Sequence, residues 1–122
     1  MRLFVTAPLT LEPKLLLAKI QEAAPALQHL IMTEEFCRAY GNELRQLVKP
    51  ENFHCFPLET SEFGECAAQV RLIEMTHLCN SVMVLRPRMP ENSPLQPEPH
   101  INMSGLAKMV EKNYLNPLVI EV

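Results

Sequence analysis

Three arginines have side chains suited to holding a small ligand: Arg71, Arg86 and Arg88. A guanidinium group donates paired hydrogen bonds to a carboxylate or a phosphate, so each of them could bind an anion. The alternative is ordinary surface, with Arg88 solvated on a loop and Arg71 on the exposed face of a helix. Arg86 follows an apolar run that predicts a strand, which places it nearest to the expected crevice.

Three glutamates, Glu59, Glu74 and Glu91, are candidates for general acid–base chemistry. A pair of carboxyl groups could act on a glycosidic bond if the two converged. Nothing in their spacing brings any two together, and scattered glutamates are usually solvated. We therefore assign no catalytic residue from the sequence and lean against an enzyme.

The chain has four histidines and four cysteines, and neither set has the spacing of a metal site. They are His29, His54, His77 and His100, and Cys37, Cys55, Cys66 and Cys79. No C-x-x-C pair occurs, although zinc sites normally use close pairs. A nucleophilic pair of Cys55 with a neighbouring histidine stays an alternative. The simpler expectation is reduced cysteines, three of them packed as small hydrophobes, with no metal and no cofactor in a cytoplasmic protein.

The composition of the chain argues against several classes of binding partner. The 122 residues suit one domain, and 48% of them are hydrophobic. The net charge of −3 and the absence of tryptophan argue against a nucleic-acid binder. No apolar run approaches the length of about 20 residues that a membrane span needs.

Apolar runs and helical periods alternate along the chain. Strands are predicted at 2–6, 27–32, 53–58, 81–85 and 117–122, and helices at 12–24, 34–48, 65–79 and after a cap at Ser104. Thr33 is a good N-cap for the second helix. Residues 86–103 hold five prolines and predict a long loop.

This order predicts a single α/β domain of the Rossmann-like, doubly wound type. Strands without polar alternation indicate a mostly parallel five-stranded sheet with helices on both faces. Ligands of such sheets bind at the carboxyl ends of the strands. The ligand-binding residues expected there are Thr6, Pro8, Thr33, Glu34, Arg71, Arg86 and Arg88. None of the three glycines stands at these strand ends, so a standard dinucleotide or Walker-type phosphate site is not expected.

Several short segments resemble the SLOG superfamily, the YspA-like and lysine-decarboxylase-related Rossmann domains. They are Met1–Thr6, Phe56-Pro57, Ala67-Ala68, Arg71, Glu74-Met75 and Pro117–Val122. The resemblance covers nearly the whole chain and implies a nucleotide or a nucleotide-derived ligand. The superfamily has glycine-rich turns where this chain has Met32–Cys37 and Arg86–Pro90, so it implies a divergent member with an altered site. The helix arginine of the family corresponds to Arg71.

The segments Arg71–Glu74 and Cys79–Val82 are also similar to the nucleoside deoxyribosyltransferase-like hydrolases. That family carries its catalytic glutamate in a glycine-containing turn after the fourth strand. Glu91 is the nearest match, but it lacks the glycine context.

Three functions follow as hypotheses. The first is a non-catalytic domain that binds a small nucleotide-like or anionic ligand, with the proline-rich loop as a cover. The second is a protein-interaction or structural module on a degenerate Rossmann scaffold, for which self-association as a homo-oligomer is expected. The third is an N-glycosidic hydrolase that uses Glu74 or Glu91.

Overall fold

A computed structural model describes residues 1–86, 98 and 100–122 of the chain. Its centre is one five-stranded sheet in the order β3-β2-β1-β4-β5, and all neighbouring strands are parallel. The strands are β1 (Arg2–Thr6), β2 (His29–Thr33), β3 (Phe53–Phe56), β4 (Ser81–Arg86) and β5 (Asn116–Glu121). The predicted parallel sheet is confirmed.

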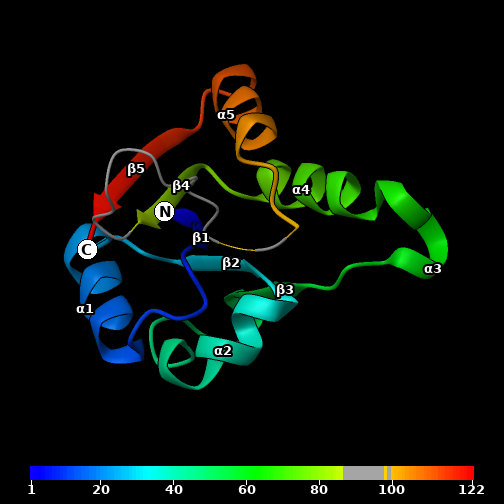
Figure 1. Cartoon of the computed structure of the whole chain (residues 1–122). Coiled ribbons are helices and arrows are strands. Elements are labelled where there is room, and N and C mark those ends of the chain that lie inside the picture. The colour runs from blue at the N-terminus through cyan, green and yellow to red at the C-terminus, as the bar shows by residue number, and fades with distance from the viewer. Residues whose placement is uncertain (87–97, 99) are drawn as a thin grey trace.

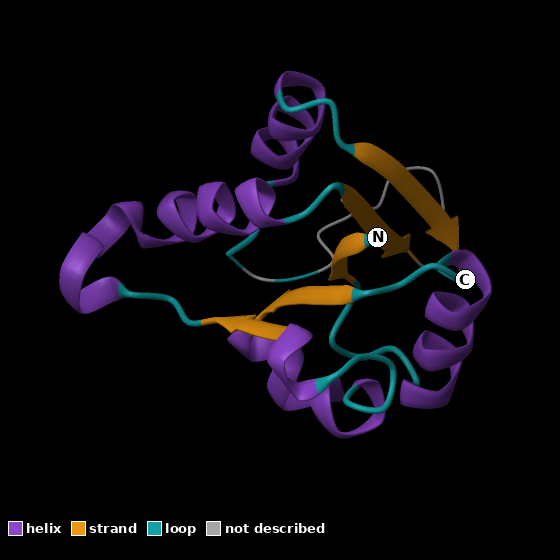
Figure 2. Ribbon diagram, turned by 180° about the vertical axis from the view of Figure 1, so that it is seen from behind, coloured by secondary structure: helices purple, strands orange, loops and turns teal. Residues whose placement is uncertain are grey.

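Helices cover both faces of the sheet. They are α1 (Pro13–Ala23), α2 (Glu34–Leu44), α3 (Thr60–Phe63), α4 (Ala67–Leu78) and α5 (Met103–Lys112). Helices α1 and α2 lie on one side of the sheet, and α4 and α5 lie on the other (Figure 1). The view from behind shows the same layers, with the short α3 reaching away from the sheet beyond the end of α4 (Figure 2). This arrangement is the expected doubly wound architecture.

Consecutive side chains of the central strand β1 belong alternately to two hydrophobic clusters. Leu3 and Val5 belong to a cluster with residues of α1 and α2, whereas Phe4 belongs to a cluster with residues of α4 and α5. All three are fully buried. A strand with no exposed face is typical of a parallel sheet covered on both sides, which explains the uninterrupted apolar runs of the sequence.

The second helix is shorter than the sequence predicts. It ends at Leu44, not at residue 48. Pro50 restricts the residue before it to extended backbone, and Lys49 has φ −64° and ψ 149°. The chain therefore leaves the helix early, through a turn in which the Leu47 amide donates to the Leu44 carbonyl at 3.0 Å.

Two other helix starts differ from the expectation. Asn102, not Ser104, caps α5, because its side-chain oxygen accepts a hydrogen bond from the Gly105 amide at 3.1 Å. The helix predicted at 65–79 begins two residues later, at Ala67 of α4, and is preceded by α3 and a 3₁₀ turn (Gly64–Cys66). Gly64 has φ +56°, a conformation that interrupts a helix and favours glycine.

The cysteines are less buried than predicted. Cys79 is buried and Cys37 half-buried, but Cys55 and Cys66 are exposed. Cys55 belongs to the edge strand β3, and Cys66 lies in the 3₁₀ turn away from the sheet. None of the helices in the described ranges combines the length and the apolar character that crossing a bilayer requires.

Candidate functional site

A buried cluster of polar side chains lies at the carboxyl ends of β1 and β2. Thr6 and Thr33 end these neighbouring strands, and both are completely buried. The Thr6 hydroxyl donates a hydrogen bond to Glu98 Oε2 at 2.6 Å, and the Thr33 hydroxyl donates to Glu98 Oε1. Glu98, which is also completely buried, thus brings a carboxyl group from the far part of the sequence to the centre of this edge.

The surroundings of Glu98 have opposing effects on the pKa of its carboxyl group. Burial is the largest effect and raises the pKa of Glu98 above its ordinary value. Hydrogen bonds from Thr33 and Thr6 and the nearby charge of Arg71 lower the pKa, whereas Glu35 raises it further. The carboxyl group therefore binds a proton more readily in the folded protein than in water.

Arg71 brings a guanidinium group to the same edge from the other face of the sheet. Its Nη1 donates to Glu35 Oε2 at 2.8 Å and contacts the Phe56 carbonyl oxygen at 3.4 Å. Only 1% of the Arg71 side chain is exposed. The alternative of an exposed helix face, considered from the sequence, is therefore wrong.

The ion pair of Arg71 joins the two helical layers. Glu35 lies in the first turn of α2, on one face of the sheet, and Arg71 lies in α4, on the other. The pair meets beyond the end of β3, whose last carbonyl oxygen belongs to Phe56. Glu35 is the acidic partner that a buried guanidinium requires.

Two nitrogen atoms of Arg71 lack an acceptor in the described part of the chain. The Nε and Nη2 atoms are buried and have no hydrogen-bond partner within residues 1–86, 98 and 100–122. An unsatisfied buried donor costs about 1–3 kcal/mol, and more when it is charged. Buried donors of this kind need an explanation, and the geometry of a guanidinium group suits an anionic oxygen.

The other expected site residues in the described ranges make contacts with residues outside this cluster. The Pro8 carbonyl oxygen accepts a hydrogen bond from the Tyr40 hydroxyl at 2.9 Å, so it serves the packing of α2. Glu34 pairs with the exposed Arg38 on its own helix. Arg86 lies 3.6 Å from a carboxylate oxygen of Glu121 on β5.

Of the seven expected site residues, the structure brings Thr6, Thr33 and Arg71 to one edge. Arg88 and the proposed acid Glu91 lie outside the described residues. Glu59 and Glu74 are exposed, and neither joins the cluster.

Sequence reasoning missed Glu35 and Glu98. Glu35 stands two residues after Thr33, but nothing in the sequence indicates that it pairs with Arg71. Glu98 lies between two prolines in the long loop, where no period or strand end marks it. Its contact with Thr6 joins residues 92 positions apart, which no local pattern reveals.

Comparison with known proteins gives no relative. No protein-family model, curated protein or solved structure matches the chain. The interpretation of the site therefore rests on its own geometry.

The cluster can both accept and donate hydrogen bonds. The Glu98 carboxylate accepts from hydroxyl groups, as it does from the two threonines. The guanidinium edge of Arg71 that carries Nε and Nη2 donates, and its geometry suits a carboxylate or a phosphate. Both groups are fixed by other contacts, so their positions do not depend on a ligand.

Proposed function

We propose that this chain is a non-catalytic binding domain for a small nucleotide-like or anionic ligand, held at the carboxyl edge of the sheet. The observation that carries the proposal is the buried guanidinium of Arg71, whose Nε and Nη2 atoms find no acceptor among the residues that the structure describes. An anionic oxygen of a ligand would satisfy them. The resemblance to the SLOG superfamily points to the same edge and the same kind of ligand.

Glu98 favours a ligand that also carries hydroxyl groups. Each carboxylate oxygen of Glu98 has a second lone pair, so the group can accept from sugar hydroxyls in addition to the two threonine hydroxyls. A ligand with both an anionic group and a sugar matches both halves of the cluster. This combination is the reason to place nucleotides first among the anions tested.

The test is a thermal-shift screen of the full chain against nucleotides, cyclic nucleotides and nucleotide sugars. A ligand at 100 times its dissociation constant should stabilise the folded state by about 2.7 kcal/mol. Phosphate and simple carboxylates belong in the panel, because they separate the anionic contact from the sugar contact. No shift with any member of the panel would refute the proposal.

Arg71→Lys is the decisive variant. Lysine keeps the positive charge beside Glu35 but lacks the guanidinium edge that holds Nε and Nη2. We expect this variant to fold and to lose at least tenfold in affinity for any ligand found in the screen. Arg86→Lys is the matched control, since Arg86 pairs with Glu121 and should leave the affinity unchanged.

A second candidate function, N-glycosidic hydrolysis, is favoured by the position of Glu98. This glutamate follows β4 in the chain, and burial raises its pKa, as suits an acid catalyst. Release of free base from nucleosides and nucleotides is the readout. Activity that survives Glu98→Gln would exclude Glu98 as the acid, and no release from any substrate would leave binding as the function.

A further inference from the structure

Two cysteines lie together where α2 packs on the edge strand β3. Cys37 belongs to α2 and Cys55 to β3. Cys55 pairs with Met32 in the register of β3 and β2, and Met32 is buried in the cluster that includes residues of α1 and α2. Cys37 packs against the same cluster. Because paired residues of neighbouring strands point to the same side, the two cysteines share one face of the sheet.

A row of residues on α2 shows which side of the helix faces β3. Cys37, Gly41 and Arg45 follow one another at intervals of four, so they lie on one side of the helix. The Arg45 guanidinium lies over the Phe53 ring, 5.0 Å from its centroid. A β-carbon on Gly41 would come within 3.1 Å of Cys37 Sγ and within 3.9 Å of the Phe53 ring. Cys55 follows Phe53 by two residues and therefore points to the same side of β3, towards Cys37.

The two thiol groups differ in how easily they lose a proton. Burial, and then the hydrogen bond and the charge of Cys37, raise the pKa of Cys55 to about 12, although the charge of Arg45 acts in the opposite direction. Cys55 therefore stays a thiol near pH 7, and Cys37 is the sulfur that can attack an oxidant. Cys55 is exposed and Cys37 is half-buried, so a small oxidant can reach the pair.

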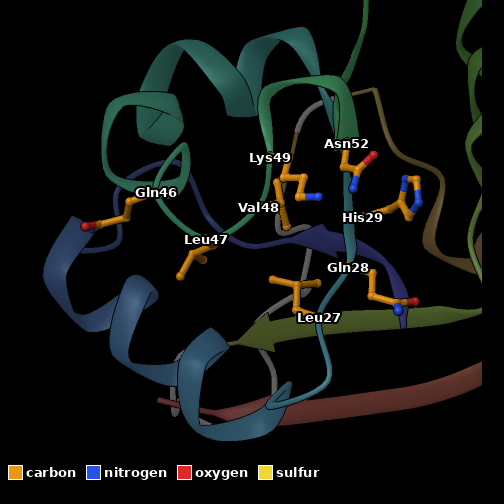
Figure 3. Close-up of a pocket in the computed structure, with 8 residues that line it drawn as sticks. All are labelled: Leu27, Gln28, His29, Gln46, Leu47, Val48, Lys49 and Asn52. Carbon is orange, nitrogen blue, oxygen red and sulfur yellow. The ribbon is translucent and has the colours of Figure 1, made fainter.

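The chain that joins α2 to β3 borders an open region. Leu47, Lys49 and Asn52 of this connection line a cavity of about 680 Å³, together with His29 at the start of β2 (Figure 3). A bond between Cys37 and Cys55 would close a loop that contains the whole connection. Closing a loop stabilises a fold mainly by restricting the unfolded chain, so this bond should strengthen a loosely packed part of the molecule.

We propose that Cys37 and Cys55 form a reversible disulfide when the protein meets hydrogen peroxide. The thiolate of Cys37 attacks one peroxide oxygen and the O–O bond breaks, which gives the sulfenic acid of Cys37 and a hydroxide that takes up the proton released by Cys37. Cys55 Sγ then attacks the sulfur of the sulfenic acid, the S–O bond breaks, and the Cys55 proton leaves with the hydroxyl group as water. The two sulfurs together lose two electrons, and the peroxide is reduced to two molecules of water.

The bond joins the two elements that hold Arg71. Glu35 of α2 stands two residues before Cys37, and the Phe56 carbonyl group of β3 follows Cys55; the oxygens of both lie against Arg71 Nη1. Oxidation therefore fixes these two partners of Arg71 relative to each other. An effect on ligand affinity rests on the proposed function, whereas the disulfide itself does not, so the bond can be measured even if no ligand binds.

The test is treatment of the full chain with hydrogen peroxide, followed by proteolysis and mass spectrometry without reduction. We expect a peptide pair in which Cys37 is bonded to Cys55 as the main product, and we expect dithiothreitol to restore both thiols. The oxidised protein should melt about 10 °C above the reduced protein, because the bond closes a loop.

The serine variants should separate the roles of the two sulfurs. In Cys55→Ser, Cys37 should still form the sulfenic acid, which dimedone traps, whereas in Cys37→Ser the thiol of Cys55 should not react with dimedone. Cys66→Ser is the matched control, since Cys66 is exposed in the 3₁₀ turn and its loss should leave the link intact. The proposal is overturned if the oxidised monomer lacks the Cys37–Cys55 link, if Cys66 or Cys79 is linked as often, or if oxidation lowers the melting temperature.

Discussion

At the scale of single residues, Glu98 is the most informative side chain. It is completely buried, it accepts a hydrogen bond from each of two threonines, and its pKa is raised. A group with these properties couples its protonation to folding. This coupling can be measured without knowing the ligand.

The first prediction concerns the pH dependence of stability. Because the folded state raises the pKa of Glu98, folding is favoured by its protonation. Its contribution to stability is full below the ordinary pKa of 4.5 and is lost as the pH rises through the higher folded value. The free energy of unfolding of the wild type, minus that of Glu98→Gln, should therefore fall as the pH rises from about 4. Denaturant titrations over a series of pH values measure this difference.

The control for this prediction is Glu74→Gln, at an exposed position of α4. Its difference from the wild type should stay flat over the same range. A flat difference for Glu98→Gln would show that the carboxyl group is not buried as described.

Thr33 and Glu98 differ in how well their place in the site could be predicted from the sequence. Thr33 ends an apolar run and precedes a helical period, so its type and position point to a strand end and a cap. Glu98 has no such context, and only the tertiary structure brings it to Thr6. Arg71 is intermediate, because the helix could be predicted, but its buried pairing with Glu35 could not.

At the scale of elements, one hydroxyl group links the start of α2 to the cluster. Thr33 Oγ1 accepts from the Phe36 amide at 3.1 Å and donates to Glu98. The same atom therefore caps a helix and orients the carboxyl group. Any substitution that removes it should affect both.

The second prediction is that Thr33→Val destabilises the protein by about 1–3 kcal/mol, because it removes a cap and leaves a buried acceptor unpaired. Thr33→Ser keeps the hydroxyl and should recover most of the loss. Chemical denaturation gives the free energies. An equal effect of Thr33→Val and Thr33→Ser would contradict the role of the hydroxyl.

Asn102→Ala is the control for this prediction. It removes the cap of α5 and should cost about 1 kcal/mol, but it should leave the pH dependence due to Glu98 intact.

Tyr40 makes a second connection between elements. Its hydroxyl group lies 2.9 Å from the Pro8 carbonyl oxygen and 2.8 Å from the Leu11 carbonyl oxygen. It thus ties α2 to the turn that leads from β1 into α1.

The third prediction is that Tyr40→Phe lowers the free energy of unfolding by about 1–2 kcal/mol, because the two carbonyl oxygens lose the single hydroxyl hydrogen that they share. Tyr114→Phe provides the comparison, since Tyr114 is 94% exposed. Thermal unfolding followed by circular dichroism should separate the two variants. Equal melting temperatures would mean that the hydroxyl of Tyr40 adds nothing.

At the scale of the whole molecule, the sheet joins two hydrophobic clusters into one folding unit. Leu3 belongs to one cluster and Phe4 to the other, although they are consecutive in β1. The two clusters lie on opposite faces of the sheet, and both include side chains of the central strand β1. Neither cluster can therefore form while β1 is unfolded. We therefore expect one cooperative transition.

The fourth prediction is that Leu3→Ala and Phe4→Ala each shift this single transition, by about 2–5 and 3–5 kcal/mol respectively. The calorimetric and van't Hoff enthalpies should agree for the wild type. Two separate transitions in either variant would show that the clusters unfold independently.

The fold as a whole follows from the sequence more directly than the site does. Each buried strand appears as an apolar run, and the four longer helices each have a helical period, so the alternation of strands and helices could be predicted from local sequence. The exact ends of the elements are harder to predict. The early end of α2, for example, depends on the backbone restriction that Pro50 places on Lys49. The expected self-association stays a prediction, which size-exclusion chromatography can test.

The burial of Tyr40 gives the protein a natural optical probe. The chain has no tryptophan and two tyrosines, and one of the two, Tyr114, is almost fully solvated. Burial has the largest effect on the pKa of Tyr40 and raises it, and the charge of Glu98 raises it further. In ultraviolet difference spectra of the unlabelled protein, the absorbance of Tyr40 should therefore change when a ligand or a proton binds at the carboxyl edge. The exposed Tyr114 serves as an internal reference.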